Sequence, residues 1–378
     1  MVVALSGFLV YYFFLTPPNY QVEQIHLKLD KKAYERLADI RERALEKGYL
    51  EREEDDYVPV EMLYRSQVLK GETRLKGDWL DHLEKDKWSF RIKLDHPLED
   101  GLKTFSIQSP DCRGHLKAYV FYQLMRENGI VCNEFRVVEL LVNGESWGVY
   151  FLEEHLTSRM IASSNRPPGV LIKFRDQAFF KATIEEKSTK GLIAASNIKM
   201  YGDLKRSNVH ENELLAAEEI MKAYQTQVPG VYERFDPLVM GKFYALCDLT
   251  GAFHAMGWIN MRFYFNFQTH KMEPVAYDPY PILDWGNPYL GANYDSYKND
   301  SLDTKSIIYA GLKNDSIRLY YDYYLENYLE NQLVENFLDK HAAELNFLEV
   351  ELQKEHGSYA FDRDFFLKHV AAIRAARN

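Results

Sequence analysis

The run FRVVELLVNGESWGVYFLEEH, residues 135–155, carries the clearest structural signal in the chain. Apolar and polar residues alternate on both sides of Asn143-Gly144, and a period of two is typical of a half-buried strand. Asn-Gly between two such runs is the strongest short-range signal of a tight β-hairpin. The stretch therefore predicts two antiparallel strands that join at Asn143-Gly144.

Four stretches before this hairpin also have the pattern of strands. They are IHLKLD (25–30), VPVEMLYRS (58–66), QVLKGETRLKG (67–77) and KWSFRIKLD (87–95). Residues 31–48 have apolar side chains at helical spacing and end at Gly48, a typical helix stop. A second helix is expected over residues 115–129. The first half of the chain is therefore predicted to be rich in antiparallel strands.

The chain after the hairpin has a different texture. Residues 170–174, VLIKF, read as one more strand, and from about residue 212 most segments are helical in pattern. Strand-like MRFYFNFQ (261–268) and MEPVAYD (272–278) interrupt the helices. This order predicts an α+β, two-lobed enzyme with a strand-rich N-terminal lobe over residues 21–175 and a helix-rich C-terminal lobe over 176–378.

The composition is that of a folded protein with room for two domains. The 378 residues are 46% hydrophobic, and 56 acidic against 46 basic side chains give a net charge of -10. This acidic balance argues against general nucleic-acid binding, which needs a basic face. Three cysteines are too few for a disulfide framework or a zinc cluster, and we expect them to be buried thiols.

An uncharged N-terminal run, residues 2–15, precedes Thr-Pro-Pro-Asn. It is short for a membrane span, and neither a cleavage site nor a preceding basic residue completes a signal-peptide pattern. Because it ends in the bulky aromatic run YYFF, we interpret residues 1–20 as a signal-anchor rather than as a buried element of the domain. That hypothesis predicts a cell-membrane protein with a single-pass anchor and an extracytoplasmic domain.

Familiar catalytic signatures such as HExxH, GxxxxGK[ST] and GxGxxG are absent from the sequence. GESWG (144–148) fits GxSxG, but it lies in the predicted β-hairpin rather than in the strand-to-helix turn of a nucleophile elbow. The candidate chemistry therefore depends on polar residues in apolar surroundings. Asp248 interrupts an almost continuous apolar helix, Asn260 precedes a strand, and Asp278 ends the next strand. A carboxylate base followed by an amide and a carboxylate that hold Mg²⁺ is the order in phosphoryl-transfer enzymes. A helix cap and a turn would explain the same residues singly.

Cations gather on two strands of the first half. Arg74 and Lys76 share one face of their predicted strand, and Arg91 and Lys93 share one face of the next. Such a pair of strands suits a nucleotide triphosphate, although a solvated basic face of a sheet has the same pattern. Lys173, in VLIKF, is a third candidate on a strand.

These motifs, in this order, resemble the spore coat protein H (CotH) kinase family. The resemblance rests on RLKGDW (74–79), KWSFRIKL (87–94), RENG (126–129), LLVNGESWGVYFLEE (140–154), VLIK (170–173), Asp248, Asn260 and VAYD (275–278). NGESWGVYFLEE is the most specific of them. The similarity covers roughly residues 60 to 300. It implies an atypical protein-kinase-like fold and, as in some members of the family, use of ATP and Mg²⁺ to phosphorylate serine in secreted coat proteins.

By this resemblance Asp248 would be the catalytic aspartate, and Asn260 and Asp278 would hold the metal. Arg74, Lys76, Arg91, Lys93, Glu154 and Lys173 would bind the nucleotide. The chain departs from the family where Tyr277-Asp278-Pro279-Tyr280 replaces Trp-Asp-x-Asp-Gly, so the second acid is missing. Asp284 is an alternative metal ligand.

Two functions from different classes follow. The first is a CotH-like ATP- and Mg²⁺-dependent protein kinase that acts on a serine-bearing envelope or extracellular protein. The second is a catalytically inactive, pseudokinase-like surface or assembly protein that binds a partner. The sequence leaves the acceptor, the transferred group and the oligomeric state open.

Overall fold

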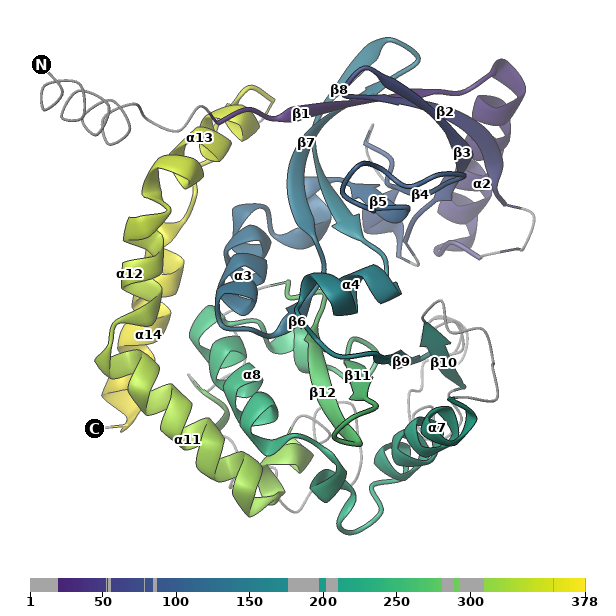
Figure 1. The fold of residues 1–378 in the computed structure, drawn as a ribbon. Coiled ribbons are helices and arrows are strands. Elements are labelled where there is room, and N and C mark those ends of the chain that lie inside the picture. The colour runs from purple at the N-terminus through teal and green to yellow at the C-terminus, as the bar shows by residue number, and fades with distance from the viewer. Residues whose placement is uncertain are drawn as a thin grey trace, which may run out of the picture.

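The computed structural model describes residues 20–377 apart from 52, 54, 55, 78, 84–86, 176–196, 202–209, 281–288, 292–308 and 356. These residues form two β-sheets with helices around them (Figure 1). One sheet is a closed barrel built from the first part of the chain. The other is an open sheet of five strands. The two sheets meet at the hairpin that the sequence marks most clearly.

The barrel has the strand order β1-β2-β3-β4-β5-β8-β7. The strands are β1 (Glu23–Lys28), β2 (Val58–Tyr64), β3 (Gln67–Leu75), β4 (Phe90–Leu94), β5 (Thr104–Gln108), β7 (Phe135–Val142) and β8 (Glu145–Glu154). Neighbours are antiparallel except β1 and β7, which pair in parallel and close the barrel. Helix α2 (Lys31–Lys47) follows β1, and its buried face joins the barrel core.

The β7–β8 hairpin turns at Asn143-Gly144, as predicted. Both residues have positive φ, 52° and 90°, which the favoured two-residue hairpin turn requires. The Asn143 side-chain oxygen accepts from the Leu29 amide at 2.8 Å, and the Asn143 amide donates to the Leu27 carbonyl at 2.8 Å. The turn is therefore fastened to the end of β1, which fixes the register of the parallel pair.

The two faces of β8 serve two different cores. Tyr150 and Leu152 point into the barrel core, whereas Val149 and Phe151 belong to the larger core that the second sheet and the helices share. Successive side chains of a strand point to opposite faces, so one strand can seal both cores. This explains why the run is apolar on both faces towards its C-terminal end.

The second sheet has the order β10-β9-β11-β12-β6. Its strands are β6 (Val131–Cys132), β9 (Gly169–Phe174), β10 (Ile198–Tyr201), β11 (Arg262–Asn266) and β12 (Lys271–Ala276). Helices α3 (Leu116–Glu127), α4 (Ser158–Ser163), α7 (Glu211–Gln225) and α8 (Pro237–Thr250) accompany it. The C-terminal helices α11 (Asp315–Glu330), α12 (Leu333–Lys340), α13 (Ala342–Gln353) and α14 (Arg363–Arg377) form an arc along one side (Figure 1).

The prediction of an α+β protein is right, but the prediction of a two-lobed kinase-like fold is wrong. The strands of the first part close into a barrel, and the second sheet takes β6 from that same part of the chain. Local alternation reveals strands but not the long-range parallel pairing of β1 with β7 that closes the barrel. The division of the chain into domains at residue 175 stays a prediction.

The predicted cell-membrane localisation is corrected as well. Among the described residues, no helix is both long and apolar enough to cross a membrane. The anchor was assigned to residues 1–20, and residues 1–19 lie outside the described part of the chain.

The three cysteines are free and buried, as expected.

Asp248 lies in the middle of the large core. The residue has no exposed surface, and its carboxylate accepts from the Tyr321 hydroxyl at 2.6 Å and from the Leu290 amide at 3.0 Å. Its backbone carbonyl contacts Nε2 of His369 on α14 at 2.5 Å. Burial raises the pKa of Asp248 to about 8, against the smaller opposing effect of these hydrogen bonds. Asp248 therefore holds α8, α11 and α14 together.

We expect Asp248 to make the protein less stable as the pH rises from about 4 to about 8. Over this range the unfolded chain releases the proton of Asp248, whereas the folded protein retains it, so the folded state loses free energy relative to the unfolded state. Asp248→Asn should remove this loss, which is on the order of a few kcal/mol. Urea unfolding at pH 5.5 and 8.5 measures it, and exposed Asp364→Asn is the control. Parallel pH profiles for wild type and Asp248→Asn would contradict the assignment.

Candidate functional site

A polar cavity of about 360 Å³ lies between the barrel and the second sheet. We call it the central cleft. Its cationic lining residues are Arg74, Lys76, Arg91, Arg113, Lys173, Lys199 and Arg262. Among the described residues only two carboxylates line it, Asp81 and Asp278. An acidic protein therefore concentrates positive charge at one place, and the low-dielectric walls of a cleft strengthen that field.

Lys76 directly follows β3 and enters the central cleft from the barrel. Its ammonium group donates to the Gln108 side chain and lies 3.8 Å from the Glu153 carboxylate. Burial, followed by the charge of Arg113, lowers the pKa of Lys76 to about 7, although Glu153 opposes the shift. An anion in the central cleft would favour the charged form of this lysine.

Arg91, on β4, is the least satisfied cation of the barrel side. It is directly opposite Arg74 of β3 in the antiparallel register, and like charges in such pairs repel. The Arg91 side chain is buried, with 8% of the residue exposed, yet its Nε and Nη1 atoms have no hydrogen-bond partner in the described structure. Buried polar groups are almost always satisfied, so these two donors point to an anionic ligand.

Asp278 comes just after β12 and faces the barrel across the central cleft. Its Oδ1 atom lies 3.1 Å from Nη1 of Arg113, and Arg113 also pairs with Glu153 at 3.3 Å. Burial would raise the pKa of Asp278, but Arg113 and three other basic groups outweigh burial and keep it below its usual value. The carboxylate is therefore ionised, and its Oδ1 makes no hydrogen bond within the described residues.

His254 connects Asp278 to Asn260. A ring nitrogen of His254, Nδ1, lies 3.0 Å from the Asp278 carbonyl oxygen. Because a carbonyl can only accept, Nδ1 must carry the hydrogen in this contact. The Asn260 amide nitrogen donates to the His254 carbonyl at 2.9 Å. The three residues form one unit, in which the oxygen of the Asn260 amide is the atom suited to a cation.

Three cations lie side by side on the second sheet. Lys173 of β9 is in register with Lys199 of β10 on one side and with Arg262 of β11 on the other. Arg262 is 3% exposed and covers the Tyr277 ring at 4.1 Å, while its Nε has no hydrogen-bond partner in the described structure. This row faces the central cleft and adds a second cationic wall to it.

The structure brings six of the residues predicted for the site to the central cleft. They are Arg74, Lys76, Arg91, Lys173, Asn260 and Asp278. Asp248 does not line it, because its carboxylate is enclosed in the core. Lys93 lies two residues further along β4 than Arg91, where it is exposed and pairs with Glu72 at 2.7 Å. Asp284 lies outside the described residues.

The structure places Glu154, the predicted nucleotide-binding glutamate of the hairpin, away from the central cleft. It pairs with Arg159 at 3.0 Å and does not line the central cleft, whereas its neighbour Glu153 contacts both Lys76 and Arg113. A shift of one residue along a strand moves a side chain to the opposite face. The hairpin is present as predicted, and of its two adjacent acids Glu153 is the one that contacts the cations Lys76 and Arg113.

Sequence reasoning missed several residues of the central cleft. They are Asp81, Arg113, His155, Lys199, His254 and Arg262. Most stand in turns or at strand ends, where no periodic pattern marks them. Two of them had a usable signal in the sequence. Arg262 begins the predicted strand β11 and His155 directly follows β8, so each is a basic side chain next to an apolar run.

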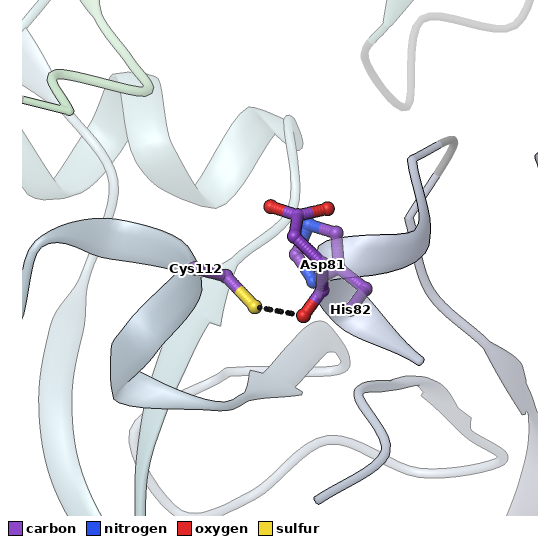
Figure 2. Close-up of side chains that lie close together, drawn as sticks. All are labelled: Asp81, His82 and Cys112. Carbon is purple, nitrogen blue, oxygen red and sulfur yellow. Dashed lines mark hydrogen bonds between the residues drawn. The ribbon is translucent and has the colours of Figure 1, made fainter. Parts of the chain in front are cut away.

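Asp81, His82 and Cys112 lie close together (Figure 2), and all three line the central cleft. One ligand-type atom from each lies within 4.8 Å of the others, a donor set that zinc can use. The Cys112 thiol, however, donates to the Asp81 carbonyl at 3.0 Å, and burial raises its pKa to about 12. The trio is therefore held by its own hydrogen bond. Gly77, at φ 110°, makes room for it, since a Cβ there would lie 2.6 Å from the His82 ring.

Comparison with known proteins agrees with the resemblance seen in the sequence. Residues 73–359 match the model of the family described as CotH kinase protein. A search of curated proteins finds no match. The matched region contains the strands, turns and strand ends that build both walls of the central cleft, from Arg74 to Asp278. Because this match covers most of the chain, the protein belongs to the CotH kinase family, which indicates a kinase-like transferase function.

Proposed function

We propose that the protein is an ATP- and Mg²⁺-dependent phosphotransferase that phosphorylates a serine hydroxyl of a protein substrate, with the central cleft as its active site. The observation that carries this proposal is Arg91, a buried guanidinium whose Nε and Nη1 lack partners while facing a cleft lined by cations. A triphosphate supplies the acceptor oxygens that these donors require. Family membership supports the same reaction class.

The acidic side of the central cleft fits a divalent cation. The carboxylate of Asp278 is ionised, and its buried Oδ1 has no hydrogen bond among the described residues, although Nη1 of Arg113 lies 3.1 Å away. The amide oxygen of Asn260 is a hard donor in the same unit. Mg²⁺ prefers such oxygen ligands and keeps several waters, so two protein ligands suffice. When bound, the ion would neutralise charge on the transferred phosphate. His254 positions both ligands through its contacts with Asp278 and Asn260.

The acceptor hydroxyl needs a group other than Asp248 to orient it. Of the two described carboxylates of the central cleft, Asp278 is assigned to the cation, whereas Asp81 stands in the short helix that follows Gly77. We assign Asp81 to the acceptor side. Phosphoryl transfer depends mainly on positioning and charge stabilisation, so one orienting carboxylate is enough.

The competing function is a non-catalytic binding protein with the same cleft. It is favoured by the position of Asp248, which stands in the core rather than beside Asp278. Such a protein would bind an anionic partner through the same cations without transferring a phosphoryl group.

Arg91→Gln should weaken ATP binding by roughly ten-fold to a hundred-fold, because a charged donor pair to phosphate is lost. Isothermal titration calorimetry measures the affinity. Lys93→Gln is the matched control, since Lys93 lies on the same strand but away from the central cleft. Equal weakening by both variants would mean that general surface charge, not the central cleft, attracts the nucleotide.

Asp278→Asn should abolish the Mg²⁺-dependent part of the thermal shift that ATP produces. Binding of ATP in the presence of EDTA should persist or tighten, because removing the carboxylate makes the central cleft more positive. Glu72→Gln, an exposed acid on β3, is the control. A shift of the same size in wild type and Asp278→Asn removes Asp278 from metal binding. The absence of any nucleotide shift in the wild type favours the binding protein.

Asp81→Asn should reduce the rate of transfer to a serine peptide while leaving ATP affinity within about two-fold of the wild type. Single-turnover assays with labelled ATP, together with calorimetry, separate the two quantities. Unchanged transfer would exclude Asp81 as the residue that orients the acceptor.

A further inference from the structure

His155 stands where the two cationic walls of the central cleft come together. It directly follows β8, and its backbone amide donates to the Thr104 carbonyl of β5 at 2.9 Å. Its ring meets the Tyr201 ring of β10 edge-on, at 5.2 Å between centroids and 88°. The imidazole is thus held from both sheets and lines the central cleft.

Four cations act on this ring. Two come from the barrel, Arg74 of β3 and Arg91 of β4, which oppose each other in register. Two come from the second sheet, Lys173 of β9 and Lys199 of β10, which also oppose each other. Burial first, and then these four charges, hold the pKa of His155 well below its usual value. We call Arg74, Arg91, Lys173, Lys199 and His155 the His155 cluster.

The two described carboxylates of the central cleft, Asp81 and Asp278, interact with other basic groups, and the charges that act on Asp81 come from Arg113, Lys76 and Asp278. Asp278 is paired with Arg113, and the effects on its charge come from Arg113, His254, Lys76 and Arg262. The acids that precede His155 are also engaged, Glu153 by Arg113 and Glu154 by Arg159. The central cleft therefore has one end where acids and bases alternate and another end, the His155 cluster, where basic groups gather.

We propose that the His155 cluster is a proton-coupled anion subsite, in which His155 takes up a proton when a phosphate group binds and then donates a hydrogen bond to it. Without an anion, the imidazolium would face four positive charges at a half-buried position. A phosphate group, with two negative charges and several acceptor oxygens, reverses that balance. It also supplies partners for Nε and Nη1 of Arg91, the buried donors that lack them.

The proton balance of this step is simple. One proton leaves solvent and binds the unprotonated ring nitrogen of neutral His155, and no covalent bond to phosphate forms or breaks. Proton binding and anion binding are linked, so each strengthens the other by the same factor. The anion must therefore bind more tightly to protein with protonated His155, that is, at low pH. The inference rests on the proposed function only in treating the central cleft as a site for phosphate groups.

Nuclear magnetic resonance of protein labelled with ¹⁵N-histidine tests the proposal directly. Sulfate is the probe, because it resembles phosphate and keeps its charge constant between pH 5 and pH 8. The His155 ring signal is identified by its loss in His155→Gln, and in the free protein its titration midpoint should lie below that of an ordinary imidazole. With saturating sulfate its titration midpoint should rise by about one pH unit or more. An unchanged midpoint, or a failure of both sulfate and tripolyphosphate to bind, overturns the proposal.

A second variant tests the coupling while the histidine stays in place. Lys199 is exposed, so Lys199→Gln should leave the fold intact, and it should raise the His155 midpoint in the free protein by removing one of the four charges. Lys70→Gln, at an exposed position of β3 outside the central cleft, should leave the midpoint unchanged. An equal change of the His155 midpoint in both variants would mean that the cations of the His155 cluster do not cause its low value.

The outcome is separable from that of the proposed function. A sulfate-dependent midpoint with no transfer from ATP would leave the anion subsite standing and reject the transferase. ATP binding and transfer with an unchanged His155 midpoint would do the reverse.

Discussion

The buried carboxylate of Glu153 is the interaction on which the architecture of the site depends. It lies 3.8 Å from Lys76, 3.3 Å from Arg113 and 2.8 Å from the Gln108 amide nitrogen, with almost no exposure of its own. Arg113 in turn reaches Asp278 at the end of β12. A chain of alternating charges therefore connects the barrel to the second sheet. Removing one member would strand a buried charge, which costs far more than the pair itself contributes.

This chain of charges explains how much of the site could be predicted. The Asn-Gly turn, the pairing of β3 with β4 and the strand β12 just before Asp278 follow from local patterns, and the structure contains all three. Barrel closure and the approach of Arg113 to Asp278 depend on contacts between distant segments, which alternation does not encode. Glu154 shows the limit of local reading: the motif indicates two adjacent acids, and only the tertiary fold decides which one faces Lys76.

Two aspartates show why burial alone misleads. Asp248 has no exposed surface, and Oδ1 of Asp278 is buried. Asp248 appeared functional because it interrupts an apolar run, and Asp278 because it ends a predicted strand. Neutral donors and apolar side chains surround Asp248, and its pKa rises to about 8. Arg113, His254, Lys76 and Arg262 surround Asp278, and its pKa falls. The first carboxylate can stay protonated and tie helices together, whereas the second must stay charged and can hold a cation.

The charge pattern divides the central cleft into two ends, one suited to a cation and one to an anion, which are the two tasks that the proposed phosphoryl transfer requires. At the Asp278 end, acids and bases neutralise each other. The carboxylate of Asp278 lies near both Arg113 and His254, and a bound cation would compete with these two partners. At the His155 end, cations from four strands converge. A polyanion would bind there favourably, because it could accept hydrogen bonds from Nε and Nη1 of Arg91, which have no partner in the described structure. Strand β8 carries Glu153, which belongs to the charge network of the Asp278 end, and it leads directly into His155 at the other end. One strand therefore positions Glu153 and His155 relative to each other. The hairpin that closes the barrel thus also sets the geometry of the cleft.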